Sequence, residues 1–514
     1  MRHSKRLNLI ALALAASALP HLAQAAQPNP DRHIVKFAPG KSAAARAALT
    51  RAAARVALEL PLHDAVAVEL PAAALAGLAR NPNIEYVEPD VVRHPMVFST
   101  PWERIPYGIP MVQADKVSDA SAGNRKVCII DSGYDRDHED LGADSNVTGE
   151  FDSGTGWWYT DENHHGTHVA GTVAAIFNGL GVVGVAPNKL LKLHIVKVFG
   201  ADGWAYSSTL TAAVDKCAAA GANVISMSLG GGASSRTEIA AFDKYYKRAG
   251  NSILSIAAAG NAGNTQVSYP AGYANVVSVA AVDENRAWAT FSQYNKDVEL
   301  AAPGVAVLST VPMGTGRKSS LSVDRIYVSA AMDGSPVGSS VTGATLVDCG
   351  TGAAACIAAV GSKVCLIERG TNTFAEKVQN CHAGGGSAAV IYNNVAGMLY
   401  GTVDGGGTTI PSVGVSDLDG AILKTKTGNG ATAAVNATNY AYFDGTSMAT
   451  PHVSAVAALV WSYRPTCSAA TLRSALTATA MDLGAAGRDT RFGFGLVQAL
   501  AAKNRLTSAA VSCP

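Results

Sequence analysis

The most informative run of the 514 residues reads Asp444-Gly445-Thr446-Ser447-Met448-Ala449-Thr450-Pro451-His452-Val453. Ser447 follows a glycine turn and precedes a long apolar stretch of small residues, Val453 to Tyr463, which predicts a buried helix. A serine at the start of a helix holds its hydroxyl clear of the backbone, with helix N–H groups beside it. Reactive serines need that placement, so Ser447 is a candidate nucleophile.

Two earlier segments also place a polar residue at the boundary of a predicted strand or helix. The first, Val127-Cys128-Ile129-Ile130-Asp131-Ser132-Gly133, is an apolar strand that ends in an aspartate. The second, His165-Gly166-Thr167-His168-Val169-Ala170-Gly171-Thr172, opens a helix with a histidine. A serine hydroxyl is a weak nucleophile until a base takes its proton, so a histidine must lie beside it in space. The order along the chain is Asp, His, Ser.

These three strings, in this order, resemble the subtilisin family (subtilases), over roughly Pro106 to Val311 and Tyr440 to Ala502. The resemblance implies a catalytic triad of Ser447 as nucleophile, His165 as base and Asp131 as its orienting carboxylate. It also implies that Asn261, in Ala257-Ala258-Ala259-Gly260-Asn261, donates to the oxyanion beside the Ser447 backbone N–H.

His164 and His168 compete with His165 for the role of base. His165 and His168 share one side of a helix, a spacing that also suits a two-histidine zinc pair. No acidic third ligand follows them as in the H-E-x-x-H motif. The family motif makes the first histidine of His-Gly-Thr-His catalytic and His168 structural.

The resemblance places a substrate-binding pocket between two segments. Ser228, Leu229 and Gly230 begin one wall, and Ala257, Ala259 and Gly260 belong to the other. We expect the first wall to pair with substrate as an added strand. Ala262, directly after Asn261, carries no charge, so we expect an apolar, roomy pocket that prefers large hydrophobic P1 side chains. The alternative is a glycine turn with no role in binding.

The family also has a structural calcium site. The matching positions here are the Glu103, Asp140 and Asn178 side chains and the carbonyls of Ile176, Leu180 and Val182. All-oxygen ligation suits Ca2+, a hard cation. Phe177 stands where the family commonly has a polar residue, and the alternative is a loop without metal.

Composition and the N-terminus indicate the class of protein and its destination. With 48% hydrophobic residues, 15% charged residues and a net charge of +1, the chain is globular and implies no nucleic-acid partner. Residues 1–25 predict a signal peptide, with basic residues, an apolar run and Ala23-Gln24-Ala25 before the cleavage point. A membrane anchor is the alternative, although the run is short for a span. We expect a secreted monomer that has no membrane partner once the signal is removed.

All eight cysteines follow the predicted signal, and an even number in an exported protein indicates disulfides. Position suggests that Cys365 pairs with Cys381 and Cys349 with Cys356, within one compact unit. Cys467 and Cys513 would tie back the C-terminal tail. Cys128 and Cys217 then pair by elimination. A zinc site is not favoured, because the chain has no C-x-x-C spacing.

Residues 27–98 predict a small unit of alternating strands and helices. The expected strands are 33–37, 64–70 and 83–88, and the expected helices are 42–56 and 71–80. The order resembles the ferredoxin-like propeptide of subtilases, which chaperones folding, inhibits the active site and is then cut off. The processing region would be 91–100. A permanent N-terminal domain is the alternative.

Residues 99–514 predict an α/β catalytic domain. Continuous apolar strands alternate with helices, which indicates a parallel sheet between helix layers. The expected strands are 126–130, 193–198, 224–227, 253–257 and 276–280, and the expected helices are 165–176, 207–220, 236–249 and 448–463. Residues 319–437 interrupt this pattern with Gly, Ser and Thr and short strands. Around Cys365 to Gly386 this mainly β insert resembles a protease-associated domain.

We therefore expect a secreted, self-processing serine endopeptidase that acts on protein and peptide substrates through an acyl-enzyme, with its own propeptide as inhibitor. The first alternative is a non-catalytic binding protein built on an inactive subtilase, against which the complete set Asp131, His165, Ser447 and Asn261 argues. The second is a phosphohydrolase with Asp131 at a strand end, but the chain lacks a phosphate-binding glycine loop with lysine.

Overall fold

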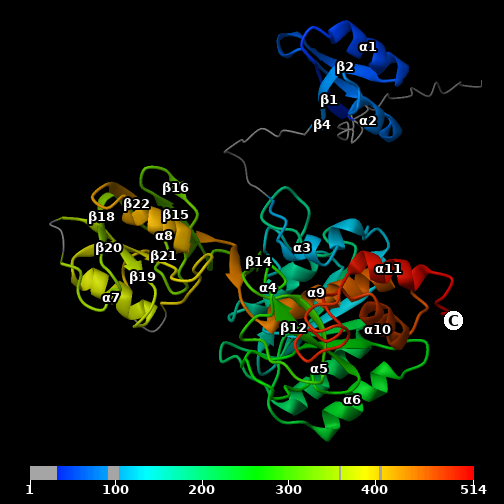
Figure 1. The fold of residues 1–514 in the computed structure, drawn as a ribbon. Coiled ribbons are helices and arrows are strands. Elements are labelled where there is room, and N and C mark those ends of the chain that lie inside the picture. The colour runs from blue at the N-terminus through cyan, green and yellow to red at the C-terminus, as the bar shows by residue number, and fades with distance from the viewer. Residues whose placement is uncertain (1–31, 91–102, 358–360, 404–407, 514) are drawn as a thin grey trace, which may run out of the picture. The chain divides into compact units, whose positions relative to one another are not determined.

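The computed structural model describes residues 32–90, 103–357, 361–403 and 408–513 (Figure 1). The chain divides into two compact units, Met1–Ser99 and Thr100–Pro514, which we describe separately. The expected signal segment, 1–25, and the expected processing region, 91–100, lie outside the described residues. In the parts of the chain that are described, no helix is both long enough and apolar enough to cross a membrane.

The first unit is an antiparallel sheet with two helices. The sheet has the order β2-β3-β1-β4. Its elements are β1 (Arg32–Phe37), α1 (Ser42–Arg51), β2 (Arg55–Leu60), β3 (Ala65–Glu69), α2 (Ala72–Leu78) and β4 (Ile84–Pro89). The helix expected over 42–56 ends early, and β2 was not predicted. Ala53 turns the chain with a φ of 54°, after which β2 pairs with β3, so backbone pairing overrides the helical tendency of an alanine-rich segment.

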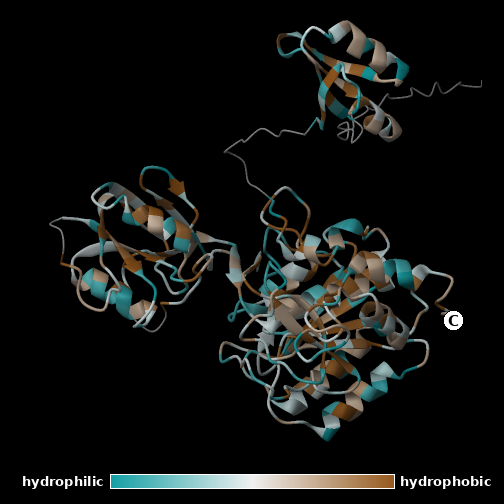
Figure 2. Ribbon diagram, viewed as in Figure 1, coloured by the Kyte–Doolittle hydropathy of each residue, from teal (hydrophilic) through white to brown (hydrophobic). Residues whose placement is uncertain are grey.

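The second unit contains a seven-stranded sheet of order β13-β12-β11-β10-β5-β9-β6, and its neighbouring strands are parallel. The strands are β5 (Lys126–Asp131), β6 (Val147–Gly149), β9 (Lys192–Lys197), β10 (Val224–Met227), β11 (Leu254–Ala258), β12 (Val276–Val282) and β13 (Val298–Pro303). Figure 2 shows that its strands are largely hydrophobic. Strands buried on both faces require helices on both faces, as the sequence predicted.

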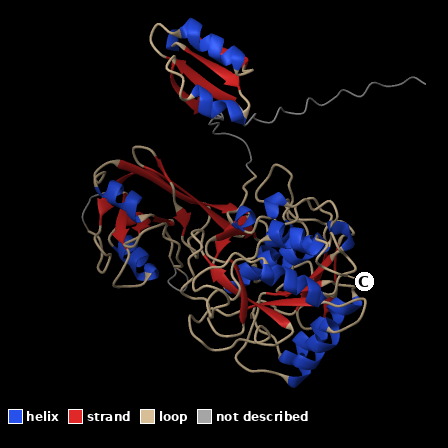
Figure 3. Cartoon of the chain, turned by 45° about the vertical axis from the view of Figure 1, so that its right-hand side comes forward, coloured by secondary structure: helices blue, strands red, loops and turns tan. Residues whose placement is uncertain are grey.

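Helices cover the two faces of this sheet (Figure 3). One face packs against α5 (Ser207–Ala219) and α6 (Arg236–Tyr246), and the other against α4 (His165–Ala174) and α9 (Thr446–Trp461). Outside the insert, the described part of this unit also has the α-helices α3 (Gly108–Met111), α10 (Ala469–Ala478) and α11 (Ala499–Thr507). Since side chains alternate along a strand, β5 supplies residues to both cores. Helix α9 is buried along nearly its whole length, including Trp461, so the serine helix is a core element.

The insert is built on its own eight-stranded sheet, of order β16-β15-β22-β18-β19-β20-β21-β17. Its elements are β15 (Gly316–Ser322), β16 (Ile326–Tyr327), β17 (Ala330–Ala331), β18 (Ser339–Asp348), β19 (Lys363–Glu368), α7 (Phe374–Ala383), β20 (Gly386–Tyr392), β21 (Ser412–Val415), α8 (Asp417–Lys424) and β22 (Gly430–Thr438). The sheet starts and ends just outside the expected 319–437. Antiparallel pairing of β14 (Val307–Thr310) with β23 (Tyr440–Phe443) brings the two ends of the insert together. Two short strands, β7 (Phe151–Asp152) and β8 (Gly156–Trp157), complete the unit.

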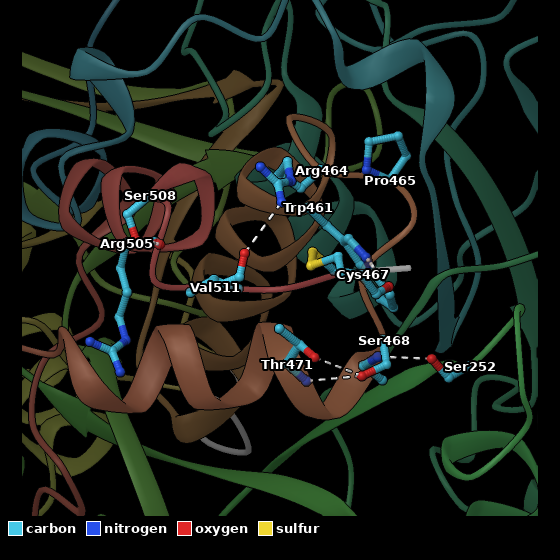
Figure 4. Close-up of a disulfide and its surroundings, with 12 residues drawn as sticks. Ser252, Trp461, Arg464, Pro465, Cys467, Ser468, Thr471, Arg505, Ser508 and Val511 are labelled. Atoms are coloured by element: carbon cyan, nitrogen blue, oxygen red, sulfur yellow. Dashed lines mark hydrogen bonds between the residues drawn. A yellow bond between two sulfur atoms is a disulfide. The ribbon is translucent and has the colours of Figure 1, made fainter.

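Four disulfides join the same pairs that the sequence suggested: Cys128–Cys217, Cys349–Cys356, Cys365–Cys381 and Cys467–Cys513. Figure 4 shows the surroundings of the last one, between α9 and α10. Trp461 at the end of α9 donates its indole N–H to the Cys467 carbonyl at 2.9 Å, and Arg464 donates to the Val511 carbonyl at 3.3 Å. The C-terminal tail is therefore fastened directly to the end of the serine helix.

Candidate active site

Asp131 and His165 meet where β5 ends and α4 begins. Asp131 is fully buried, and its Oδ1 accepts hydrogen bonds from His165 Nδ1 at 2.8 Å and from the Ser132 N–H at 2.7 Å. The His165 side chain is 25% exposed, so Nε2 is the ring nitrogen left for another partner. A carboxylate on Nδ1 holds the tautomer in which Nε2 can accept a proton.

Two glycines allow this close approach. A Cβ atom on Gly166 would lie only 2.3 Å from the Gly133 carbonyl oxygen. Gly133 itself has a φ of 126°, and a Cβ there would lie 1.9 Å from the Thr160 oxygen. A side chain at Gly166 would push the start of α4 away from the segment that follows β5, and one at Gly133 would displace the chain at Thr160 and Asp161, just before α4.

The surroundings of His165 favour its charged form. Burial lowers the pKa of the imidazole, but the charge and hydrogen bond of Asp131, with a smaller contribution from Asp161, raise the pKa above its ordinary value. The opposing effects are desolvation and the attraction of nearby negative charges.

The other two candidate histidines have different surroundings. His168 is fully buried, stacks on Phe443 and directs Nε2 to the carbonyls of Val307 and Ala441 at 2.9 and 3.1 Å. Burial lowers the pKa of His168 to about 3, so it stays neutral and ties α4 to β14 and β23. His164 precedes the helix with a φ of 71° and donates its backbone N–H to Asp161. Of the three, His165 is the one bonded to Asp131.

Ser447 lies in the first turn of α9 and is partly exposed, whereas Thr446 and Met448 beside it are buried. Its Oγ donates to the Ser228 carbonyl at 3.1 Å, and Ser228 Oγ donates back to the Ser447 carbonyl at 2.7 Å. Within the described residues, the serine hydroxyl makes no hydrogen bond to His165. Such bonds are often absent from sites that hold no substrate.

Asn261 is oriented by the start of α9. Its Oδ1 accepts from both the backbone N–H and the hydroxyl of Thr446, each at 2.8 Å, which turns Nδ2 the other way. Gly445 has a φ of 152°, and a Cβ built on it would lie 3.3 Å from Asn261 Nδ2 and 3.5 Å from the Ser447 nitrogen. These two nitrogens therefore border one space beside Gly445, the arrangement that an oxyanion needs.

A cavity of about 300 Å3 adjoins Ser447. Its lining residues are Leu229, Gly230, Gly231, Gly232, Ala258, Gly260, Asn261, Ala262, Gln266, Val267, Ser268, Gln293, Thr446 and Ser447. The lining carries no charged side chain among the described residues. Its six polar residues make it less apolar than the sequence suggested: Asn261, Gln266, Ser268, Gln293, Thr446 and Ser447.

The predicted pocket residues divide between this cavity and its surroundings. Leu229, Gly230 and Gly260 line the cavity, and Ser228 contacts the Ser447 backbone instead. Ala257 and Ala259 lie in the hydrophobic cores, whereas Ala258 between them reaches the cavity. Because both side chains are buried in the cores, Ala257 and Ala259 can act at the cavity only through their backbone.

The predicted calcium loop folds around a buried acid. Asp140 Oδ2 accepts from the Val182 N–H at 2.8 Å, while Oδ1 is buried and has no hydrogen-bond partner among the described residues. Burial, together with the nearby Glu103 charge, raises the pKa of Asp140 to about 7. Glu103 in turn accepts from the backbone of Asn178 at 2.6 Å. An unsatisfied buried carboxylate oxygen beside a second carboxylate fits a cation with oxygen ligands.

The fold and these contacts define a hydrolase with a serine at a helix start, a carboxylate-held histidine and a paired N–H site. Comparison with known proteins agrees. The profile of the Subtilase family matches residues 123–331 and 405–495, and that of the PA domain matches 341–423, which overlaps the start of the second range. A Fervidolysin N-terminal prodomain profile matches 19–90. The chain belongs to the subtilase family and is a serine endopeptidase with an N-terminal prodomain and a protease-associated insert.

Similar proteins include subtilisin DY from Bacillus licheniformis, 42% identical over 222 residues, which are 41% of this chain and 77% of that protein. An alkaline protease from Alkalihalobacillus alcalophilus is 38% identical over 255 residues, which are 49% of this chain and 63% of that protein. The crystal structure of the psychrophilic subtilisin-like protease Apa1, from the Antarctic psychrotroph Pseudoalteromonas sp. AS-11, matches with a TM-score of 0.66 and 44% identity, covering 80% of this chain and all of that one.

Sequence reasoning missed several residues of the site. Asp161 binds the start of α4, and Gln293, Ser268 and Val267 close the cavity. An acidic residue shortly before a predicted helix is a capping signal, so Asp161 was open to prediction. The cavity residues follow no local pattern, because they come from loops that meet only in the fold.

The histidines provide a direct test of these surroundings. We expect the His165 imidazole to titrate above about 6.5, the ordinary value, because Asp131 stabilises its charged form. His168 and His452, whose pKa values burial lowers to about 3 and about 4, should stay neutral from pH 5 to 8. Imidazole 1H–15N correlation spectra recorded across this pH range would measure all three. Titration of His168 within it would contradict the buried, neutral assignment.

Proposed function

We propose that this chain is a secreted, self-processing endopeptidase in which Ser447 attacks the peptide bond, His165 is the general base and Asp131 orients it. The observation that carries the proposal is the 2.8 Å bond from His165 Nδ1 to the buried Asp131, with Ser447 at the start of α9. The same complete set of groups argues against a non-catalytic binding protein.

The geometry supports acyl transfer in two steps, in which an acyl-enzyme forms and is then hydrolysed. Rotation about the Ser447 side chain moves Oγ from the Ser228 carbonyl toward His165 Nε2, which takes the proton as Oγ attacks the carbonyl carbon. The oxygen that becomes negative is stabilised by Asn261 Nδ2 and the Ser447 N–H. His165 then gives its proton to the leaving amine, and water repeats the sequence to release the acid. Loss of one oxyanion donor typically lowers turnover about 10²–10³-fold, as measured in subtilisin.

The cavity beside Ser447 supports a preference for large hydrophobic P1 side chains. It offers about 300 Å3 with no charged group among its described lining residues. An Arg or Lys side chain would bury its charge there without a carboxylate partner, which is unfavourable. Substrate backbone would pair with Ser228, Leu229 and Gly230 on one wall and with the backbone of Ala257 to Gly260 on the other.

The domain plan supports export and zymogen processing. We assign residues 1–25 to a signal peptide, 27–98 to a propeptide that inhibits the active site, and 99–514 to the catalytic domain with the insert at 319–437. The prodomain match over 19–90 supports the second assignment. Four disulfides support an oxidising, extracellular destination, and we propose that the mature enzyme is a monomer.

Substitution of the nucleophile should block maturation. We expect Ser447→Ala to give a folded, unprocessed precursor that a serine-directed phosphonate does not label, because no hydroxyl remains to attack. Ser454→Ala is the matched control in the same helix, since the Ser454 hydroxyl is buried and has no partner among the described residues. Mass spectrometry and N-terminal sequencing would read out both variants. Normal maturation of Ser447→Ala, produced in isolation, would refute the assignment.

We also propose that the loop holds a structural calcium ion, with Glu103, Asp140 and Asn178 side chains and the carbonyls of Ile176, Leu180 and Val182 as ligands. The unpartnered Asp140 Oδ1 supports the site, and calcium supplies there the positive charge that a buried carboxylate needs. Glu103 and Asp140 hold the two ends of the loop through backbone N–H groups, so the loop is shaped before any ion binds.

Calcium should therefore raise thermal stability. A ligand at 100 times its dissociation constant stabilises the folded state by about 2.7 kcal/mol, so we expect a melting temperature several degrees higher in calcium than in chelator. Asp140→Asn should abolish this difference. Asp137→Asn, in the same segment but with a highly exposed side chain, should retain it. Identical melting curves of the wild type with calcium and with chelator would remove the site.

We propose that the insert selects substrates at the rim of the active site. Tyr400 of the insert lies 5.6 Å, between ring centroids, from Tyr442 in β23, two residues before Asp444. Burial, with nearby negative groups that include Asp444, raises the pKa of Tyr400 to about 12. The insert thus contacts the strand that leads directly into the Ser447 turn.

Replacing residues 319–437 with a short Gly/Ser linker should preserve hydrolysis of a small p-nitroanilide peptide, because none of the proposed catalytic groups lies in the insert. It should change the ranking of large protein substrates. Tyr400→Ala should change that ranking in the same direction, and Leu418→Ala, an exposed residue of the same insert, should not. Loss of small-peptide hydrolysis in a folded deletion variant would show that the insert completes the catalytic site.

A further inference from the structure

The carboxylate of Asp161 accepts four hydrogen bonds at the start of α4. Oδ1 accepts from Ser132 Oγ at 2.8 Å and from the His164 N–H at 3.0 Å. Oδ2 accepts from the N–H and the hydroxyl of Thr167, at 2.8 and 2.6 Å. Asp161 is nearly buried, so these bonds replace water around its charge. It therefore satisfies N–H groups that a helix start leaves free, and a negative charge is favoured there.

Ser132 links this carboxylate to the strand that carries Asp131. Its hydroxyl donates to Asp161 and accepts from the Gly166 N–H at 2.8 Å. The Asp131–His165 bond thus has a parallel bond between the next residues of each segment, Ser132 and Gly166. Two parallel bonds fix the orientation of one segment against the other better than one, because a single bond leaves rotation about its axis free.

The charge of Asp161 also acts on the imidazole. Among the residues that the structure describes, the charged or titratable groups that act on His165 are Asp131, Asp161 and His168. His168 is neutral, with its pKa lowered to about 3, so the two carboxylates dominate near neutral pH. An imidazolium forms when His165 takes the serine proton, and an anion that is already in place stabilises it without reorganisation.

We propose that Asp161 and Ser132 are positioning residues for His165: Ser132 locks the helix start against β5, and Asp161 adds a second negative charge that stabilises the imidazolium. This inference rests on the proposed function of His165 as general base. Neither residue touches the substrate or the serine. A helix cap alone would account for the bonds to His164 and Thr167, but it would not require the link through Ser132 to the strand of Asp131.

Three substitutions distinguish a role in positioning His165 from a role that is limited to capping α4. Asp161→Asn removes the charge and puts an amide group against one of the two donor pairs. Ser132→Ala keeps the charge and three of the four bonds to Asp161, so it should fold even if Asp161→Asn does not. Ser468→Ala is the control, because Ser468 caps α10 by accepting from the Thr471 N–H at 3.1 Å, as Figure 4 shows. Each precursor would be matured with wild-type enzyme added in trans, so that a slow variant still loses its propeptide.

The readouts are kcat, KM and the pH dependence of kcat/KM on a p-nitroanilide peptide, with the melting temperature of each variant. We expect Asp161→Asn to lower kcat about 10–100-fold with little change in KM. It should also move the acidic limb of the kcat/KM–pH profile to lower pH by about half a unit or more, because the imidazolium loses a stabilising negative charge. Ser132→Ala should lower kcat without moving that limb. Ser468→Ala should lower only the melting temperature.

The proposal is overturned if Asp161→Asn and Ser132→Ala fold but keep kcat within about twofold of the wild type, as Ser468→Ala is expected to do. It is also overturned if Asp161→Asn leaves the acidic limb of the kcat/KM–pH profile unmoved, because the charge then does not stabilise the His165 imidazolium. Wild-type enzyme that neither hydrolyses the peptide nor takes a phosphonate label on Ser447 would refute the proposed function itself, so the two failures are distinguishable.

Discussion

The contact between Gly133 and Gly166 is the constraint on which the arrangement of the site depends. The segment that follows a parallel strand and the start of a helix can touch there only because Gly166 carries no side chain, and Gly133 has a φ of 126° that favours glycine. That contact lets a fully buried carboxylate reach an imidazole at the edge of the cleft. The backbone approach is thus a precondition for the electrostatics, since the effect of Asp131 on His165 falls off with distance and with solvent.

The serine side of the site depends on a buried helix that is bonded to its surroundings at both ends. Helix α9 is buried against the sheet and fastened at its far end by the disulfide of Cys467 and the indole of Trp461. At its start, Thr446 holds Asn261 by two bonds to one oxygen, which leaves the amide nitrogen for the cleft. Donors fixed in this way do not have to reorganise when charge develops during the reaction.

The insert returns to the catalytic domain at a polar junction beside the proposed calcium loop. Glu139, next to Asp140, accepts from Asn439 Nδ2 at 2.8 Å and from the Tyr440 hydroxyl at 3.1 Å. The Asn439 side-chain oxygen also receives the Gly314 N–H from the outgoing arm. Both arms therefore meet at one point, which explains how more than one hundred residues can enter the chain shortly before Ser447 without disturbing it.

Local sequence determined five of the seven strands of the parallel sheet, β5 and β9 to β12, and the four helices that cover it, because each is a run with a distinct pattern. The motifs that resemble those of subtilases named Asp131, His165, Ser447 and Asn261. Local sequence did not foresee β2, whose backbone pairs with β3, nor the turn of Ala258 into the cavity in place of its two neighbours. Three neighbouring histidines competed for the role of base, and the family motif favoured His165; the packing of α4 against β5, β14 and β23 turns His165 to the carboxylate and buries His168. Pattern is a property of neighbours in the chain, whereas burial, close approach and charge depend on residues that meet only once the chain has folded.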